Sequence, residues 1–282
     1  GQYHFAPGEE MQHDTSPHVV EIDNKRVHVE TASLVLCHSH MLFFQHYPRF
    51  TRFVCKTFMH DGLTYLGAVC GRCMIDNTHV IVLRGTGKNM VPVPEMEAFG
   101  ERYGFKWAAH ERGDPDRKAR VERSFWYIET NFHAGRKWSS LDELNAAAIA
   151  WCDKVNAKFR KRLHASPREL FAVERTRMTP LPDHFPEPYQ LFDRIVDVEG
   201  YVAVHNQRYS APYALIGRRL EVRETRATLE LFDGPRQVGV HKKIVGRATS
   251  THVALPEHRP PRGTKAAARP PSMEETSLAA IP

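Results

Sequence analysis

The 282-residue sequence lacks any apolar run that approaches the ~20 residues needed for a membrane-spanning helix. It also lacks the charged and apolar segments of an N-terminal signal peptide. These absences argue against a secreted or helical membrane protein, and they predict a soluble intracellular protein. The chain begins at Gly1 rather than Met, from which we expect a piece of a longer protein.

Cysteine is scarce, and its number is odd. Five cysteines do not form the paired framework of a small secreted domain, so we expect reduced thiols. Cys70 and Cys73 have the C-x-x-C spacing of zinc and redox sites. A structural zinc site normally needs four ligands, and no second cysteine pair exists, although a histidine such as His38, His40 or His79 could contribute. Small buried core residues are the favoured interpretation of this pair.

Positive charge is concentrated in one part of the chain. Residues 1–116 contain 11 Lys+Arg and 14 Asp+Glu, whereas residues 117–282 contain the remaining 28 and 19, a net charge of +9. Between Arg117 and Arg177 the basic residues outnumber the acidic ones by 14 to 7. This local excess suggests a polyanionic partner near that segment.

Three acidic residues have the character of a metal site that acts on nucleic acid. They are Asp14, Asp76 at the end of an apolar run, and Glu122 within a basic stretch. Carboxylate oxygens are the ligands that Mg²⁺ and Mn²⁺ prefer. Phosphodiester chemistry needs an activated oxygen nucleophile and neutralised charge on the departing oxygen, and two metal ions can supply both.

The pattern of apolar residues before residue 134 predicts an α/β domain with an antiparallel start. An Asp23-Asn24 turn joins two short strands, and we expect Asp14 at or just before the first of them. Asp114 and Pro115 suit the start of a helix that carries Glu122 on the flank of its apolar stripe. The other expected elements are a third strand over 32–44, a helix from 49, a strand over 72–75, a helix from 94 and a strand over 105–109.

Four regions are expected along the chain: an α/β core over 1–134, a helical connector over 135–185, a small β-barrel over 186–248 and a disordered tail over 249–282. In the connector, Ser140 starts a long amphipathic helix whose apolar stripe runs to Phe159. Regular turn signals suggest the barrel, and the proline-rich, aperiodic end suggests the tail.

Each acid taken singly has a common structural interpretation, as a turn residue at Asp14, a strand end at Asp76 and a solvated ion pair at Glu122. Their joint context favours a site, because a basic stretch able to hold a phosphate backbone follows them. The basic residues with which we associate DNA are Lys118, Arg120, Arg123, Lys158, Arg160, Lys161 and Arg162. A solvated helix face is the alternative interpretation of the last four.

From Gln2 to Lys243 the chain resembles the IstA-type transposases of bacterial insertion sequences. The resemblance is carried by Asp14, Asp76-Asn77 and the Lys118–Arg123 segment with Asn131-Phe132, followed by Leu141–Asn145 with Trp151. Pro180-Leu181-Pro182 and Tyr209–Pro212 leading to Gly217 fit the terminal barrel of that family. The resemblance implies an RNase H-like catalytic core, a mixed sheet flanked by helices, with an Asp-Asp-Glu triad.

Carried over to this chain, the resemblance implies that Asp14, Asp76 and Glu122 bind two Mg²⁺ or Mn²⁺ ions as catalytic residues of a polynucleotidyl transferase. Such enzymes cut a strand at each transposon end and use the freed 3′-hydroxyl to attack target DNA. The implied partners are double-stranded DNA, further copies of the chain and an AAA+ helper ATPase, in the bacterial cytoplasm at the nucleoid, with no membrane association.

Two departures from the family pattern concern Asp14 and the N-terminus. Thr15-Ser16 follows Asp14 where the family has an aromatic residue, and the helix-turn-helix region that recognises transposon ends would precede Gly1. Two other functions stay open: a catalytically silent DNA-binding or regulatory protein on the same fold, and an RNase H-type nuclease that cuts RNA·DNA hybrids.

Overall fold

The computed structural model describes residues 4–76, 78–110, 124–183, 186–244 and 251–259. The chain divides into two compact units, Gly1–Pro186 and Glu187–Pro282. The expected helical connector therefore lies within the first unit, while the four-part division itself stays a prediction. No helix among the described residues has the length and apolar character needed to cross a bilayer.

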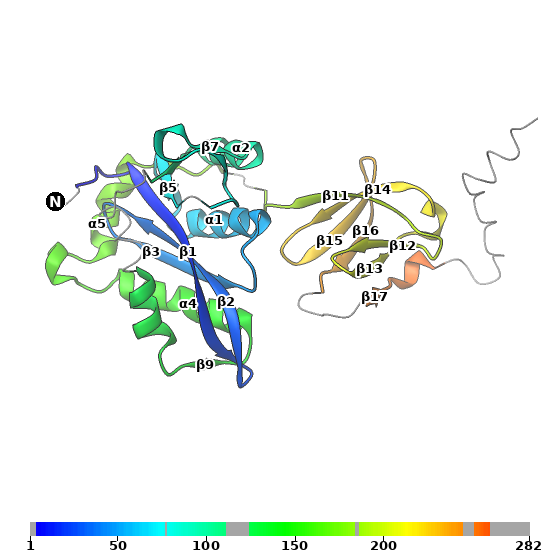
Figure 1. Cartoon of the computed structure of the whole chain (residues 1–282), viewed down its shortest axis with the longest axis horizontal. Helices are drawn as coiled ribbons and strands as arrows, with labels where there is room; N and C mark the ends of the chain where they lie inside the picture. Colours follow the sequence, from blue (N-terminus) through cyan, green and yellow to red (C-terminus); the bar gives the residue numbers. More distant parts are fainter. Residues whose placement is uncertain (1–3, 77, 111–123, 184–185, 245–250, 260–282) are drawn as a thin grey trace, which may run out of the picture. The chain divides into compact units, whose positions relative to one another are not determined.

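A mixed sheet organises the first unit, in the strand order β3-β2-β1-β5-β8, with β9 paired to the far end of β1. Strands β1, β2 and β3 are antiparallel, and β5 and β8 run parallel to β1. Figure 1 shows β1 passing through the sheet beside β2 and β5. The strand bounds are β1 Glu10–Ile22, β2 Lys25–Leu36, β3 Leu42–Tyr47, β5 Arg72–Ile75, β8 Lys106–Ala109 and β9 Lys137–Trp138.

The antiparallel start and the mixed α/β architecture are confirmed, with two corrections. The first strand, β1, is longer than expected and includes Asp14, and the apolar run over 32–44 is divided between β2 and β3. Asp23 and Asn24 both adopt left-handed backbone angles, as the expected two-residue hairpin requires. The expected strand over 72–75 is β5.

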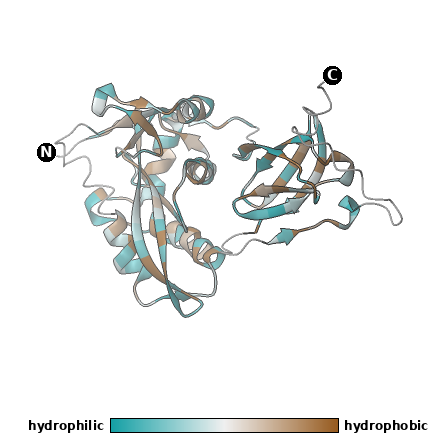
Figure 2. Ribbon diagram, turned by 45° about the vertical axis from the view of Figure 1, so that its right-hand side comes forward, coloured by the Kyte–Doolittle hydropathy of each residue, from teal (hydrophilic) through white to brown (hydrophobic). Residues whose placement is uncertain are grey.

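Apolar side chains alternate between the two faces of this sheet. Leu34 belongs to a core with α1 and α2, whereas Val35 belongs to a second core with α4. Figure 2 shows hydrophobic residues along the strands and the helices that cover them. The helices are α1 Arg52–Leu66, α2 Pro94–Tyr103, α4 Leu141–Asn156 and α5 Pro167–Glu174.

Helix α4 is shorter than its apolar pattern predicts. The Ser140 side chain caps it as expected, but the helix ends at Asn156, whose side chain bonds to Leu42 N and O at 3.0 and 2.8 Å. Phe159 therefore lies beyond the helix and is exposed, not part of the apolar stripe. Ser166 and Glu169 form a complete capping box at the start of α5.

Short elements complete the first unit. They are β4 Ala68–Val69 paired with β10 Thr179–Pro180, β6 Val82–Arg84 paired with β7 Val91–Pro92, and single turns at Gly87–Asn89, Lys161–Leu163 and Arg175–Arg177. One π-helical turn, Glu129–His133, follows α-helical residues 124–128.

The second unit is all-β, as expected, but its strands form two sheets and a closed barrel is not shown. One sheet has the order β11-β14-β15-β16 and the other β12-β13-β17. The segment 251–259, which the sequence assigns to the tail, is structured here: β17 pairs with β13, and His258 is buried. The strands are β11 Gln190–Ile195, β12 Tyr201–Val204, β13 Gln207–Ser210, β14 Arg219–Glu224, β15 Thr228–Asp233, β16 Arg236–Lys242 and β17 His252–Val253.

Candidate functional site

Asp14 and Asp76 are brought together by the pairing of two parallel strands. The last paired residues of β1 and β5 are His13 and Ile75, and Asp14 and Asp76 are the next residues on each chain segment. Adjacent strands lie about 4.8 Å apart, so these two carboxylates arise from neighbouring backbone positions. The sheet therefore brings together two residues that are 62 positions apart in the sequence.

Strand alternation places both carboxylates on the face of the sheet that α4 covers. His13 contacts the α1 side, since its ring lies 5.1 Å from the ring of Phe58. Ile75 belongs to the same core as α1. The following residues, Asp14 and Asp76, therefore lie on the opposite face, where both are partly exposed. Burial lowers the pKa of His13 to about 4, which keeps this neighbour of Asp14 uncharged.

The surroundings of Asp14 are polar although they are buried. Ser33 is the cross-strand partner of Asp14, and Gln12 precedes it by two residues on the same face. Ser33 Oγ, Thr31 Oγ1 and Gln12 Oε1 are buried without a hydrogen-bond partner among the described residues. Buried polar atoms of this kind normally have a partner. Two carboxylates beside unsatisfied oxygens form a donor set that fits a hard divalent cation.

The third predicted acid, Glu122, lies outside the described residues, as do Asn77, Lys118, Arg120 and Arg123. The helix that follows Glu122 in sequence is described from Ser124, and Phe125, Ile128 and Phe132 join the core on the α4 face. This is the face on which Asp14 and Asp76 lie. Among the residues that the structure describes, no group of three or more His, Cys, Asp or Glu side chains is arranged to hold a metal.

Sequence reasoning missed a histidine cluster farther along the α4 face. The rings of His18 and His133 are 4.9 Å apart, and His46 Nε2 lies 2.8 Å from His133 Nε2. Burial lowers the pKa of His46 to about 3 and that of His133 to about 4. His18 and His46 occupy alternating strand positions, and this periodicity is the one sequence signal that could have indicated buried histidines.

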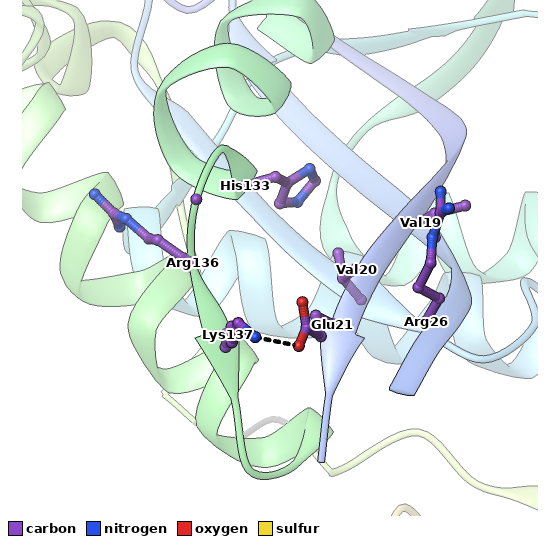
Figure 3. Close-up of a pocket in the computed structure, with 8 residues that line it drawn as sticks. Val19, Val20, Glu21, Arg26, His133, Arg136 and Lys137 are labelled. Atoms are coloured by element: carbon purple, nitrogen blue, oxygen red, sulfur yellow. Dashed lines mark ion pairs between the residues drawn. The ribbon is translucent and has the colours of Figure 1, made fainter. Parts of the chain in front are cut away.

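Two pockets open beside β1 near this cluster, of about 420 and 570 Å³. Both lie beyond the part of β1 that pairs with β5, and the first extends to Glu21 and Lys137, where β1 pairs with β9. Figure 3 shows the first pocket, where Lys137 forms an ion pair with Glu21 at 2.6 Å. The shared lining residues are Val19, Arg26 and His133.

The described members of the predicted DNA-binding set lie together between α4 and α5. Lys158, Lys161 and Arg162 are exposed, and Arg160 is half-buried. These four side chains form no ion pair with any residue in the described ranges. The exposed charges are therefore available to an anionic ligand.

All five cysteines are buried and free, as the core interpretation predicts. Burial raises the pKa of Cys55, Cys70 and Cys73, and it raises the pKa of Cys152 to about 12. Cys70 and Cys73 both belong to the core beneath α1. Protonated, buried thiols are poor metal ligands and poor nucleophiles.

Comparison with known proteins relates both units to transposition proteins. Residues 181–252 match the family model "Mu transposase, C-terminal domain". The chain is 25% identical over 265 residues to the transposase for insertion sequence element IS21 of Pseudomonas aeruginosa, covering 92% of this chain and 67% of that protein. It is 32% identical over 147 residues to a putative transposase of Mycobacterium tuberculosis, covering 51% and 36%. It thus spans only part of these relatives.

Matches among solved structures include retroviral integrases. The catalytic core domain of the HTLV-2 integrase in complex with magnesium has a TM-score of 0.41 and 13% identity, covering 60% of this chain and 99% of that one. The catalytic core domain of the BIV integrase has a TM-score of 0.43 and 11% identity, covering 59% and 96%. In sequence, the chain is similar to the transposases of IS21-type insertion elements, and the resemblance read from its motifs is confirmed.

Proposed function

We propose that this chain carries the catalytic part of a DNA transposase, a polynucleotidyl transferase that cuts a strand at each transposon end and joins the 3′-hydroxyl to target DNA. The observation that carries the proposal is the placement of Asp14 and Asp76 one residue beyond the paired positions His13 and Ile75. The transposase relatives support the same conclusion.

Asp14, Asp76 and Glu122 are the residues that we propose to bind two Mg²⁺ or Mn²⁺ ions. When bound, such ions supply an activated oxygen nucleophile and neutralise charge on the departing oxygen. The chain's own contribution is orientation. Asp14 is held within a continuous strand, and its Oδ1 accepts a hydrogen bond from Thr15 N at 2.8 Å, which fixes the carboxylate plane.

The proposed fold is RNase H-like, which the antiparallel β1–β3 and parallel β5 and β8 support. We propose that the second unit is the small β-barrel of the transposase family and that its two sheets are parts of this barrel. The proposed partners are transposon-end and target DNA, other copies of the chain and an AAA+ helper ATPase, in the cytoplasm at the nucleoid.

This function is tested by measuring strand transfer with Mn²⁺, a pre-cleaved transposon-end duplex and the helper ATPase. Asp14→Asn, Asp76→Asn and Glu122→Gln are expected to abolish product while DNA affinity is retained. Asp142→Asn, an exposed acid in the first turn of α4, is the matched control and should keep activity.

The two alternatives predict different results in the same assay. A catalytically silent DNA-binding protein gives no product with the unaltered chain, and unchanged strand transfer in any triad variant rejects our assignment. An RNase H-type nuclease would cut an RNA·DNA hybrid in preference to duplex DNA. We expect no such preference, because the basic segment after α4 and the second unit would have no use in a hybrid nuclease.

A further inference from the structure

The loop between α4 and α5 exposes an aromatic ring among positive charges. Residues 154–168 contain six Lys and Arg and no Asp or Glu. Within this stretch the Phe159 side chain is 59% exposed, between exposed Lys158 and half-buried Arg160. A large apolar ring that stays in water gains no folding free energy from burial, so its position needs another explanation.

This loop, defined here as the basic loop over residues 157–165, has an ordered backbone. Arg160 N donates to Ala165 O at 3.0 Å, and Leu163 N donates to Arg160 O at 3.0 Å. His164 takes left-handed backbone angles that close the turn. These bonds hold the backbone of the loop directly after Phe159.

Both ends of the basic loop are anchored in the first unit. Asn156, which is fully buried, bonds to Leu42 of β3 just before the loop. Ser166 caps α5 just after the loop, where its Oγ accepts a hydrogen bond from Glu169 N at 3.2 Å. A preorganised loop loses little conformational entropy on binding, which favours a recognition role.

Tyr127, in the helix that follows Glu122 in sequence, links that helix to α4 and lies near Arg160 of the basic loop. The Tyr127 ring lies 5.2 Å from Trp151 of α4, and the Tyr127 phenol is close enough to Arg160 to influence the pKa of that guanidinium, which burial lowers. Trp126, the neighbour of Tyr127, is 66% exposed. A second exposed aromatic residue therefore stands on the element adjoining the loop.

We propose that the basic loop binds an unpaired DNA base by stacking on Phe159, while Lys158, Lys161 and Arg162 contact the flanking phosphates. The inference rests on the proposed function and adds a ligand class, single-stranded nucleotides at a DNA end. Aromatic stacking beside backbone-tracking cations is the chemistry with which proteins hold unpaired bases. Paired bases inside a duplex offer no free face to such a ring.

The test uses the full chain in EDTA, so that it is independent of metal binding and strand transfer. The probes are a blunt duplex and the same duplex with a three-nucleotide overhang containing 2-aminopurine, whose fluorescence is quenched by stacking. The unaltered chain should bind the overhang DNA more tightly and quench it. Phe159→Ala should weaken overhang binding about five-fold or more, remove the quenching and leave blunt-duplex affinity unchanged.

Two further variants separate stacking from charge. Phe159→Trp should keep both the quenching and the preference for the overhang. Changing Lys158, Lys161 and Arg162 together to Gln should weaken binding of both DNAs and flatten the salt dependence, since each phosphate contact contributes to that slope.

The matched control is Val173→Ala, which removes another exposed apolar side chain, on α5. It should change neither the affinity for the two DNAs nor the quenching. Equal quenching and affinity in Phe159→Ala and the unaltered chain would overturn the inference. Loss of blunt-duplex binding in Phe159→Ala to the same extent as overhang binding would also overturn it. Strand transfer that fails while these binding results hold would count against the proposed function alone.

Discussion

His46 Nε2 and His133 Nε2 are 2.8 Å apart, so that the edge strand β3 is joined to the π-helical turn after Ile128. His46 Nδ1 lies 3.2 Å from Asn145 Oδ1, an atom that can only accept. His46 Nδ1 therefore donates to the amide, His46 Nε2 accepts, and His133 Nε2 donates. The arrangement requires the His46 imidazole to be neutral, because its Nε2 must accept, and burial favours the neutral form of His133 as well.

The free energy of unfolding should fall as pH is lowered from about 6.5 toward 3. The pKa of His46 is lowered to about 3 and that of His133 to about 4, both by burial, against an unfolded value of 6.5. Below 6.5 the unfolded chain binds protons that the folded chain does not, so stability is full above this pH and is lost below it. The expected loss is roughly 1.4 kcal/mol per pH unit for each histidine, measured by urea denaturation.

The control for this effect is a pair of glutamine variants. His46→Gln should make the slope of stability against pH shallower by about one proton, because its amide can still accept from His133 but does not titrate. His28→Gln, at an exposed position on β2, should leave the slope as it is. An unchanged slope in His46→Gln would show that the buried pair does not govern the acid sensitivity.

Asn156→Ala should destabilise the first unit strongly. The side chain satisfies both Leu42 N and Leu42 O, and it donates to the Tyr65 hydroxyl at 3.2 Å. Removing it leaves buried backbone groups unpaired, at a cost of about 3 kcal/mol in the free energy of unfolding. Denaturant titration measures this change. The nearby Lys154→Ala, at an exposed site on α4, should lower the free energy of unfolding by less than about 0.5 kcal/mol. Equal losses in the two variants would show that the bonds between Asn156 and Leu42 do not stabilise the unit.

Gly239→Ala should loosen the segment 251–259 from the second unit. A Cβ at Gly239 would lie 2.7 Å from His258 Cε1, closer than a real contact permits. His258 Nε2 lies 3.1 Å from Val238 O, so displacing the ring breaks its anchor. Hydrogen exchange of the amides at 252–258 should therefore become faster. Val240→Ala, one residue away and 45% exposed, should leave their exchange unchanged, and slow exchange in both variants would contradict this docking.

The first residues of helices could be predicted from the sequence where capping residues determine them. Pro94 begins α2, and Ser166 with Glu169 begins α5 through a complete capping box. Ser140 begins α4, yet Glu143 turns back to Ser139 N at 2.6 Å, so the box there is not reciprocal. Side-chain oxygens near a helix start act on adjacent residues, which is why sequence suffices to find them.

Features that depend on distant residues were not predictable. The first strand is longer than expected, and β1 continues through Pro17 because no strand is described on that side of β1 between the ends of β5 and β9. The end of α4 is set by the bond between Asn156 and β3, not by the apolar period that continued to Phe159. The proximity of Asp14 and Asp76 could be expected from strand order, whereas the His46 and His133 pair requires the fold.

The most direct test of the account is the affinity of the chain for Mn²⁺, measured by electron paramagnetic resonance without DNA. If Asp14, Asp76 and Glu122 share one site, each of Asp14→Asn, Asp76→Asn and Glu122→Gln should weaken Mn²⁺ binding, and the double Asp14, Asp76 variant should lose little more than either single one. Asp142→Asn should bind as the unaltered chain does. Full Mn²⁺ affinity in both Asp14→Asn and Asp76→Asn would contradict a shared metal site.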